Sequence, residues 1–219
     1  MKAASEAQRR MILVGAIIGC GIVTAAVPAF AANFSARETS RGLHVDRAGG
    51  AMGKLSSNGW FRRPGEPMFV YREGGKTVAG VWVGSSDAAM VRSGTTESSP
   101  LVGRIVPAWK NGQLWLTIEP AGGAAVQTTV FQRASGGGAL DRHTSTWEAL
   151  QGSYRATLQA GGKDAGWLSV DVSAEGGARF SGDLPASIPP ALAAAAAASI
   201  EDEVNYIYGN LSDVNPLMR

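Results

Sequence analysis

The sequence contains few of the residues that most often carry chemistry. Its 219 residues include one cysteine and two histidines, and charged residues make up 17% of the chain. A single cysteine cannot pair within the chain, which excludes a disulfide-rich mini-protein. With 45% hydrophobic residues and a formal net charge of +2, the chain also lacks the composition of an intrinsically disordered protein. It is long enough to bury a core, as one domain or two small ones.

The sequence motifs of the common enzyme classes are missing as well. The chain has no G-x-S-x-G elbow, H-E-x-x-H helix, phosphate-binding P-loop or C-x-x-C pair. Glycines 136–138 lack a following Lys-Ser or Lys-Thr, which is typical of a linker and not of a phosphate cradle. No cofactor is therefore predicted, and the residues favour a protein without catalytic activity.

The N-terminus has the pattern of an export signal. Lys2, Arg9 and Arg10 precede an uncharged apolar run that ends in Ala29-Phe30-Ala31. Small residues at positions 29 and 31 are what a signal peptidase accepts, so we expect residues 1–31 to be removed. This predicts a periplasmic or secreted protein that has lost its only cysteine and has no membrane contact after cleavage.

Other interpretations of this segment stay open. Residues 11–29 are near the length of a membrane-spanning helix, which would leave the protein membrane-anchored. Ile17-Ile18-Gly19-Cys20 resembles a lipoprotein box with Cys20 as the acylated residue, although a polar spacer does not follow it. The pair Arg9-Arg10 is a weak match to a twin-arginine motif, so the export route also stays open.

Export would remove the net charge. Residues 1–31 hold three basic residues and one acidic residue, which accounts for the whole formal charge of +2. A neutral mature chain offers no support for a nucleic-acid partner or an anionic membrane. The charge is nevertheless uneven: residues 32–182 carry 16 basic and 12 acidic side chains, whereas residues 183–219 carry one basic and five acidic.

Strand patterns dominate the middle of the chain. Short runs with β-branched and aromatic residues alternate with turn signals, of which Asn111-Gly112 is the strongest. Apolar and polar residues alternate in several runs, which indicates one buried and one wet face. We predict a mainly β domain over residues 59–183, an antiparallel β-barrel or β-sandwich of about eight strands, at 68–72, 77–83, 104–109, 113–118, 125–131, 153–158, 166–172 and 178–182.

Three further features complete the picture of this domain. Residues 32–58 show no sustained period and are predicted to be a flexible lead-in. Pro107 places its strand at an edge or at a bulge. Glycines 136–138 form a flexible joint between two lobes, but each lobe would have only four or five strands, so we expect one shared core.

The last predicted element is a C-terminal amphipathic helix over residues 187–211, followed by a tail at 212–219. Pro189-Pro190 suits a first helical turn, and the alanines that follow have high helix propensity. We expect the helix to plug or cover the sheet. The alternative is a helix that docks onto a partner through its apolar stripe, with the candidate contacts Ile200, Val204, Ile207 and Leu211.

Candidate ligand contacts come from the tryptophans. Trp109 and Trp115 flank the Asn111-Gly112 turn, at offsets that would allow them to pair across strands. With Trp60 they are our candidates for stacking on a sugar ring or an apolar ligand, although core packing is the commoner role of such residues.

The two histidines are the candidates for chemistry. His44 has Asp46 two residues away, and His143 has Asp141 at the same spacing. If loops brought these residues together, they would form a metal site or a base with its orienting acid. Nothing local determines their separation, so we expect exposed loop histidines and no metal.

These features predict an exported cell-envelope binding or interaction protein without catalytic activity, whose partner is a protein, a glycan or a small apolar ligand. One alternative is an envelope hydrolase that uses His44 or His143. The other is a structural subunit of an envelope assembly that docks through the C-terminal helix. Clustered histidines would favour the hydrolase, an open interior would favour ligand binding, and an exposed apolar helix would favour assembly.

Overall fold

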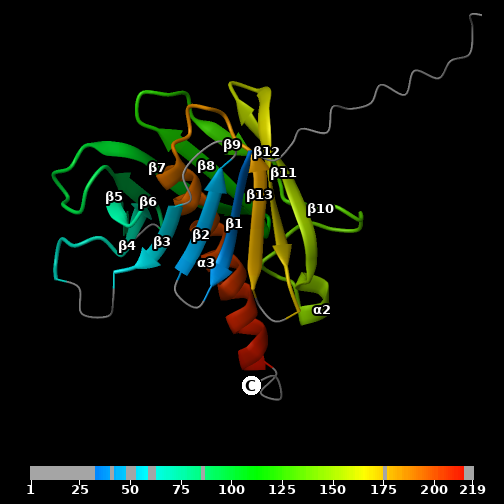
Figure 1. Cartoon of the computed structure of the whole chain (residues 1–219). Helices are drawn as coiled ribbons and strands as arrows, with labels where there is room; N and C mark the ends of the chain where they lie inside the picture. The colour runs from blue at the N-terminus through cyan, green and yellow to red at the C-terminus, as the bar shows by residue number, and fades with distance from the viewer. Residues whose placement is uncertain are drawn as a thin grey trace, which may run out of the picture. The chain divides into compact units, whose positions relative to one another are not determined.

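The described part of the chain contains thirteen strands and two helices (Figure 1). This computed structural model describes residues 33–39, 42–47, 53–58, 63–84, 87–174 and 177–214, with the side chains of Trp147 and residues 210–214 left aside. The elements are β1 (Phe34–Thr39), β2 (Gly42–Arg47), β3 (Gly53–Ser57), β4 (Phe69–Glu73), β5 (Lys76–Val83), β6 (Ala89–Arg92), β7 (Leu101–Lys110), β8 (Gln113–Pro120), β9 (Val126–Thr128), β10 (Gln132–Arg133), α2 (Trp147–Leu150), β11 (Gly152–Ala160), β12 (Lys163–Val172), β13 (Ala178–Asp183) and α3 (Pro190–Val214).

Twelve of the strands close into an antiparallel barrel. Neighbours in the chain pair with one another from β1 to β9, and β13 pairs with β1. The ring closes where β9 pairs with β11, with Leu158 opposite Thr128. The short strand β10 pairs with a different stretch of β11, opposite Tyr154 and Arg155, and lies outside the ring. Closure removes the exposed edges that an open sheet would present.

The prediction of a mainly β barrel with a C-terminal helix is confirmed, but the predicted number of about eight strands is wrong. Each predicted run contains a strand, although the run at 125–131 is reduced to β9. Five further strands, β1, β2, β3, β6 and β10, lie in segments for which no strand is predicted. The expected flexible lead-in at 32–58 is likewise wrong for its described residues, because β1, β2 and β3 form part of the ring.

These early strands have a weak sequence signal because their inward positions include small residues. Ala36 and Gly53 face the interior, where a large side chain would have no room. A Cβ atom on Gly53 would lie 1.9 Å from the hydroxyl oxygen of Tyr71, whose ring occupies that space. Because periodicity is read from large apolar residues, a strand with small inward residues escapes recognition.

The turn predicted at Asn111-Gly112 is confirmed. Lys110 pairs with Gln113 across it, and both turn residues have positive φ, at 52° and 80°. Asparagine and glycine tolerate this left-handed conformation better than other residues. The turn therefore sets the register of β7 against β8.

Helix α3 lies inside the ring. Every residue from Ala191 to Ala197 is buried, which on a helix means burial on all sides. The helix contacts strands from different parts of the ring, namely β1, β2, β3, β5, β6, β7 and β8. A ring of twelve strands is wider than side chains alone fill, and an alanine-rich helix is slim enough to enter it.

The rest of the interior is filled by side chains in one continuous core. Large residues such as Phe131, Tyr154, Leu158 and Phe180 belong to the same buried cluster as the helix alanines. This continuity confirms the expectation of one shared core over two separate lobes. The barrel is thus packed on one side by its own side chains and on the other by α3.

Candidate functional site

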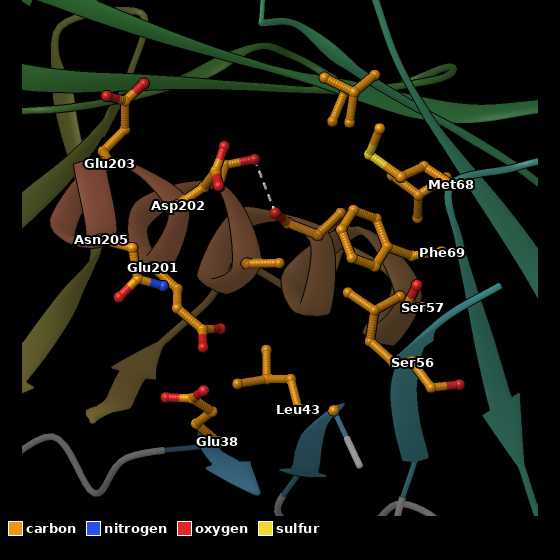
Figure 2. Close-up of a pocket in the computed structure, with 18 of the residues that line it drawn as sticks. Glu38, Leu43, Ser56, Ser57, Met68, Phe69, Glu201, Asp202, Glu203 and Asn205 are labelled. Carbon is orange, nitrogen blue, oxygen red and sulfur yellow. Dashed lines mark hydrogen bonds between the residues drawn. The ribbon is translucent and has the colours of Figure 1, made fainter. Parts of the chain in front are cut away.

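One end of the barrel holds a cavity of about 660 Å³ between α3 and the strands β1 to β7 (Figure 2). Several of its strand residues lie at strand ends: Thr39 ends β1, Gly42 begins β2 and Phe69 begins β4. Antiparallel neighbours bring such ends to one rim. The middle of α3, from Ala195 to Asn205, forms the opposite wall.

Local sequence explains why space is left here. The helix presents the small residues Ala195, Ala198 and Ser199 to the cavity. Pro107 of β7 also lines the cavity. The pairing of β7 with β6 ends at Ile105, so Pro107 lies beyond the paired stretch. Proline has no N–H group, so Pro107 itself leaves no donor unpaired beyond the end of β6. The prediction that Pro107 places its strand at an edge or a bulge is wrong, because β7 pairs with β6 on one side and β8 on the other, and the pairing with β8 is regular through Pro107.

The strand wall of the cavity is mostly apolar. Figure 2 shows Leu43 of β2, Phe69 of β4 and Met68, the residue before β4, on the side that faces the helix. Leu55 and Val81 complete this wall from β3 and β5. Methionine adapts its shape to an irregular neighbour, which suits a surface that binds ligands.

The mouth of the cavity is acidic. Its charged lining residues are carboxylates throughout, and come from β1, the turn before β6, and α3: Glu38, Asp87, Glu201, Asp202 and Glu203. In Figure 2 the carboxyl groups of Glu38 and Glu201 point toward one another from β1 and α3. No lysine, arginine or histidine belongs to the described lining.

Burial and mutual repulsion change the protonation of Glu201. Its pKa is raised to about 8, first by burial, then by the charge of Glu38 and a hydrogen bond with it, and last by the charge of Asp202. A carboxyl group in this position keeps its proton at neutral pH. When Glu201 ionises, no basic residue of the described lining is present to balance its charge.

Glu203 has a defined partner. The indole N–H of Trp109 donates a hydrogen bond of 2.7 Å to Oε2 of Glu203. Burial raises the pKa of Glu203, the Trp109 hydrogen bond opposes that shift, and the charges of Asp202 and Asp87 add to it. The bond joins β7 to α3 beside the cavity.

The tryptophans predicted to bind ligand occupy different places. Trp109 is opposite Leu114 and Trp115 is opposite Ala108, so the two rings lie on opposite faces of the hairpin and do not pair. The cross-strand pairing expected for them is wrong, because a one-residue offset in register changes the face. Trp115 lies under the Lys110 ammonium group, 4.9 Å from its ring centre, and neither ring lines the cavity. Trp60 lies outside the described residues.

The apolar stripe of the helix is buried within the barrel. Ile200, Val204 and Ile207 are at most 1% exposed and belong to the core. They are not accessible to a partner while α3 stays inserted. The side chain of Leu211, the fourth docking candidate, lies outside the described part.

The histidines are far apart. His44 lies in β2 and not in a loop, whereas Asp141 bridges to Gln113 at the start of β8, with His143 two residues on. β2 and β8 are six strands apart in a ring of twelve, which places them on opposite sides. Asp46 lies in β2 with His44. Among the described residues, no group of three or more histidine, cysteine, aspartate or glutamate side chains is arranged to hold a metal.

Sequence reasoning missed the cavity because its lining comes from separate segments. Glu38 and Leu43 were assigned to the lead-in, and Met68 and Phe69 to an ordinary strand. Only Glu201, Asp202 and Glu203 gave a signal, as a short acidic run off the apolar stripe of a helix.

Comparison with known proteins found no matching protein-family model, no matching curated protein and no matching solved structure. In the part of the chain that the structure describes, neither helix combines the length and the apolar character needed to cross a bilayer. The structural class is therefore stated from the fold itself: a closed antiparallel barrel of twelve strands around a C-terminal helix.

Proposed function

We propose that this protein is an exported binding protein that holds a small amphiphilic ligand in the cavity at the end of its barrel. The ligand's apolar body lies against the strand wall, and a positively charged group lies at the acidic mouth. The observation that carries the proposal is one cavity of about 660 Å³ that combines an apolar wall with charged residues of a single sign. Small-molecule sites are usually concave and mostly apolar, with a few polar groups that orient the ligand.

The apolar wall supports the ligand's body. Met68 and Phe69 are partly exposed and present thioether and aromatic surface to the cavity, whereas Leu43 and Leu55 line it with at most 3% of their surface exposed. Covering that surface with an apolar group removes it from water, at about 25 cal/mol per Å². This gain is independent of charge.

The acidic mouth supports a cationic group. Glu201 and Glu38 repel one another when both are ionised, and the raised pKa of Glu201, about 8, reflects this. A cation between them would replace repulsion by attraction and would release the proton that Glu201 holds. Binding is then expected to be tighter above pH 8 than below it.

The binding site is tested with an uncharged fluorescent probe, N-phenyl-1-naphthylamine, whose emission rises when it leaves water. The protein should bind it at a single site. Ala198→Phe, which fills the cavity from α3, should weaken binding by about tenfold or more, because the probe loses most of its apolar contact. Ala124→Phe, at an exposed residue outside the cavity, is the matched control and should bind as the parent does. Thermal melts confirm that both variants fold.

The charge preference is tested with three ligands that share a 4-phenylbutyl group and end in trimethylammonium, hydroxyl or carboxylate. At pH 9 the cation should bind about tenfold more tightly than the alcohol, and the carboxylate least tightly. Glu201→Gln should remove this order, whereas Glu97→Gln, at an exposed carboxylate outside the cavity, should keep it. Absence of naphthylamine binding would refute the site itself. Equal binding of the three ligands would refute only the cationic group.

A further inference from the structure

A row of basic residues crosses five neighbouring strands of the barrel. Arg37 of β1 is directly opposite Arg179 of β13 on one side and His44 of β2 on the other. His44 is opposite Lys54 of β3, and Lys54 is opposite Arg72 of β4. The five residues Arg179, Arg37, His44, Lys54 and Arg72, here called the basic row, therefore stand at one level of the sheet. Figure 1 shows their strands side by side.

The basic row lies on the outer face of the barrel. Its neighbours along the strands, such as Ala36, Val45, Leu55 and Phe180, are at most 3% exposed and belong to the core. Because side chains alternate between faces, the row points away from the core and the cavity. Arg37 and Arg179 are exposed, and the other three are partly exposed.

The basic row is unfavourable for the isolated protein. Like charges directly opposite one another on a sheet are destabilising. In the described part of the chain, no ion pair includes a member of the row, since the recorded pair joins Arg104 to Glu119. Arg72 donates to the hydroxyl of Ser56, and Asp171 stands opposite Arg179 at one end. Asp46 also lies on this face, two residues from His44, but the pairs Arg37–Arg179 and Lys54–Arg72 still place like charges directly opposite one another. An arrangement of this kind points to an external partner.

We infer that the basic row binds an anionic polysaccharide that runs across strands β13 to β4. At a strand spacing of about 4.8 Å the row extends for roughly 19 Å, and its charges follow one line. A linear polymer with a negative group on each sugar repeats its charge along a line in the same way. This binding is independent of the proposed ligand in the cavity, because the two surfaces are on opposite faces of the sheet.

The surroundings of the row favour a polysaccharide over other polyanions. Ser35 and Ser181 are opposite one another on the same outer face, two residues along their strands from the row, and Ser56 lies beside Lys54 in the same way. Hydroxyl groups suit hydrogen bonding with sugars. In the described part, the exposed large hydrophobic residues lie on β5, β6, β7 and α3. None of them lies on the strands that carry the basic row, β13 and β1 to β4. Lipid insertion and base stacking would need such residues beside the row.

The experiment compares two double variants that remove the same charge. Arg37→Gln with Lys54→Gln removes two cations from the row. Lys110→Gln with Lys163→Gln removes two exposed cations from the ends of the β7–β8 and β11–β12 hairpins, away from the row. Binding of polygalacturonate and heparin is measured at low and moderate salt, with neutral dextran as the uncharged comparison. Vesicles of equal parts phosphatidylglycerol and phosphatidylcholine, and a single-stranded oligonucleotide, are tested in parallel.

The parent should bind both anionic polysaccharides, with an affinity that falls as salt rises, and should not bind dextran. The row variant should lose about tenfold or more in affinity, while the control pair should stay within about twofold. The row variant should also melt at a higher temperature than the parent at low salt, because like-charge repulsion is relieved.

Three results would overturn the inference. Equal loss in both double variants would mean that net charge alone is responsible. Binding to neither anionic polysaccharide would mean that the row has no such partner. Row-dependent binding to the vesicles or the oligonucleotide, without polysaccharide binding, would assign the row to a lipid surface or a nucleic acid.

Discussion

The indole N–H of Trp109 and the carboxylate of Glu203 form a hydrogen bond of 2.7 Å between residues 94 positions apart in the chain. The bond links the free end of β7 to the internal helix beside the cavity. Here the helix is held by a polar contact as well as by packing. Its strength can be measured.

A double-mutant cycle between Trp109→Phe and Glu203→Ala should give a coupling energy of about 1–3 kcal/mol, because the bond joins a neutral donor to a carboxylate. Urea unfolding of the parent, both single variants and the double variant provides it. The coupling should be larger at pH 9 than at pH 5, since ionised Glu203 is the better acceptor. A coupling near zero at both pH values would show that the contact adds nothing to stability.

Replacing Val204 with aspartate should lower the free energy of unfolding by several kcal/mol, because it places a charge without a partner in the core. Tyr206→Asp is the matched control, since Tyr206 is on the same helix and 61% exposed. It should change stability by about 0.5 kcal/mol or less. Thermal melts of the parent and the two variants measure this difference. A Val204→Asp variant with the melting temperature of the parent would mean that the helix leaves the barrel in solution.

The stability of the protein should fall as the pH rises toward 8. Folding raises the pKa of Glu201 from 4.5 to about 8, so the folded protein keeps a proton that the unfolded chain has already released in this range. The free energy of unfolding must then decrease with rising pH. Melting temperatures from pH 5 to pH 9 should show this decline, and Glu201→Gln should flatten it. Glu97→Gln should leave the decline unchanged, and a parent without any decline would contradict the assignment.

Export should remove residues 1–31. The mature protein recovered from the producing cells should begin at Ala32, as judged by N-terminal sequencing and intact mass. A chain that retains residues 11–29 would support the membrane anchor instead. A lipid on Cys20 at a new N-terminus would support the lipoprotein interpretation.

Local signals in the sequence were sufficient for several elements. Asn111-Gly112 predicted a turn because two successive positive φ angles restrict the residues that occupy it. Leu114, Leu116 and Ile118 predicted a strand with one buried face, and all three are fully buried. The alanines from Ala191 onward predicted a helix through their intrinsic propensity. Each of these features depends on residues that are close in the chain.

The number of strands and the cavity depended on partners distant in the chain. Ala36 and Gly53 look unremarkable locally, and only the fold shows that they face the interior, where the Tyr71 ring fills the space beside Gly53. Glu38 approaches Glu201 only after β1 has joined the ring and the helix has entered it. Local periodicity carries no information about which segment will fill an interior.

The sequence by itself determined the class of the fold, the strongest turns and the helix, because these follow from backbone preferences and short-range alternation. Only the tertiary structure decided that twelve strands close into a ring, that the helix lies inside it, and that one cross-strand level gathers five basic residues. The physical reason is register: a shift of one residue would move every side chain of a strand to the other face. That choice is made by packing between segments far apart in the chain.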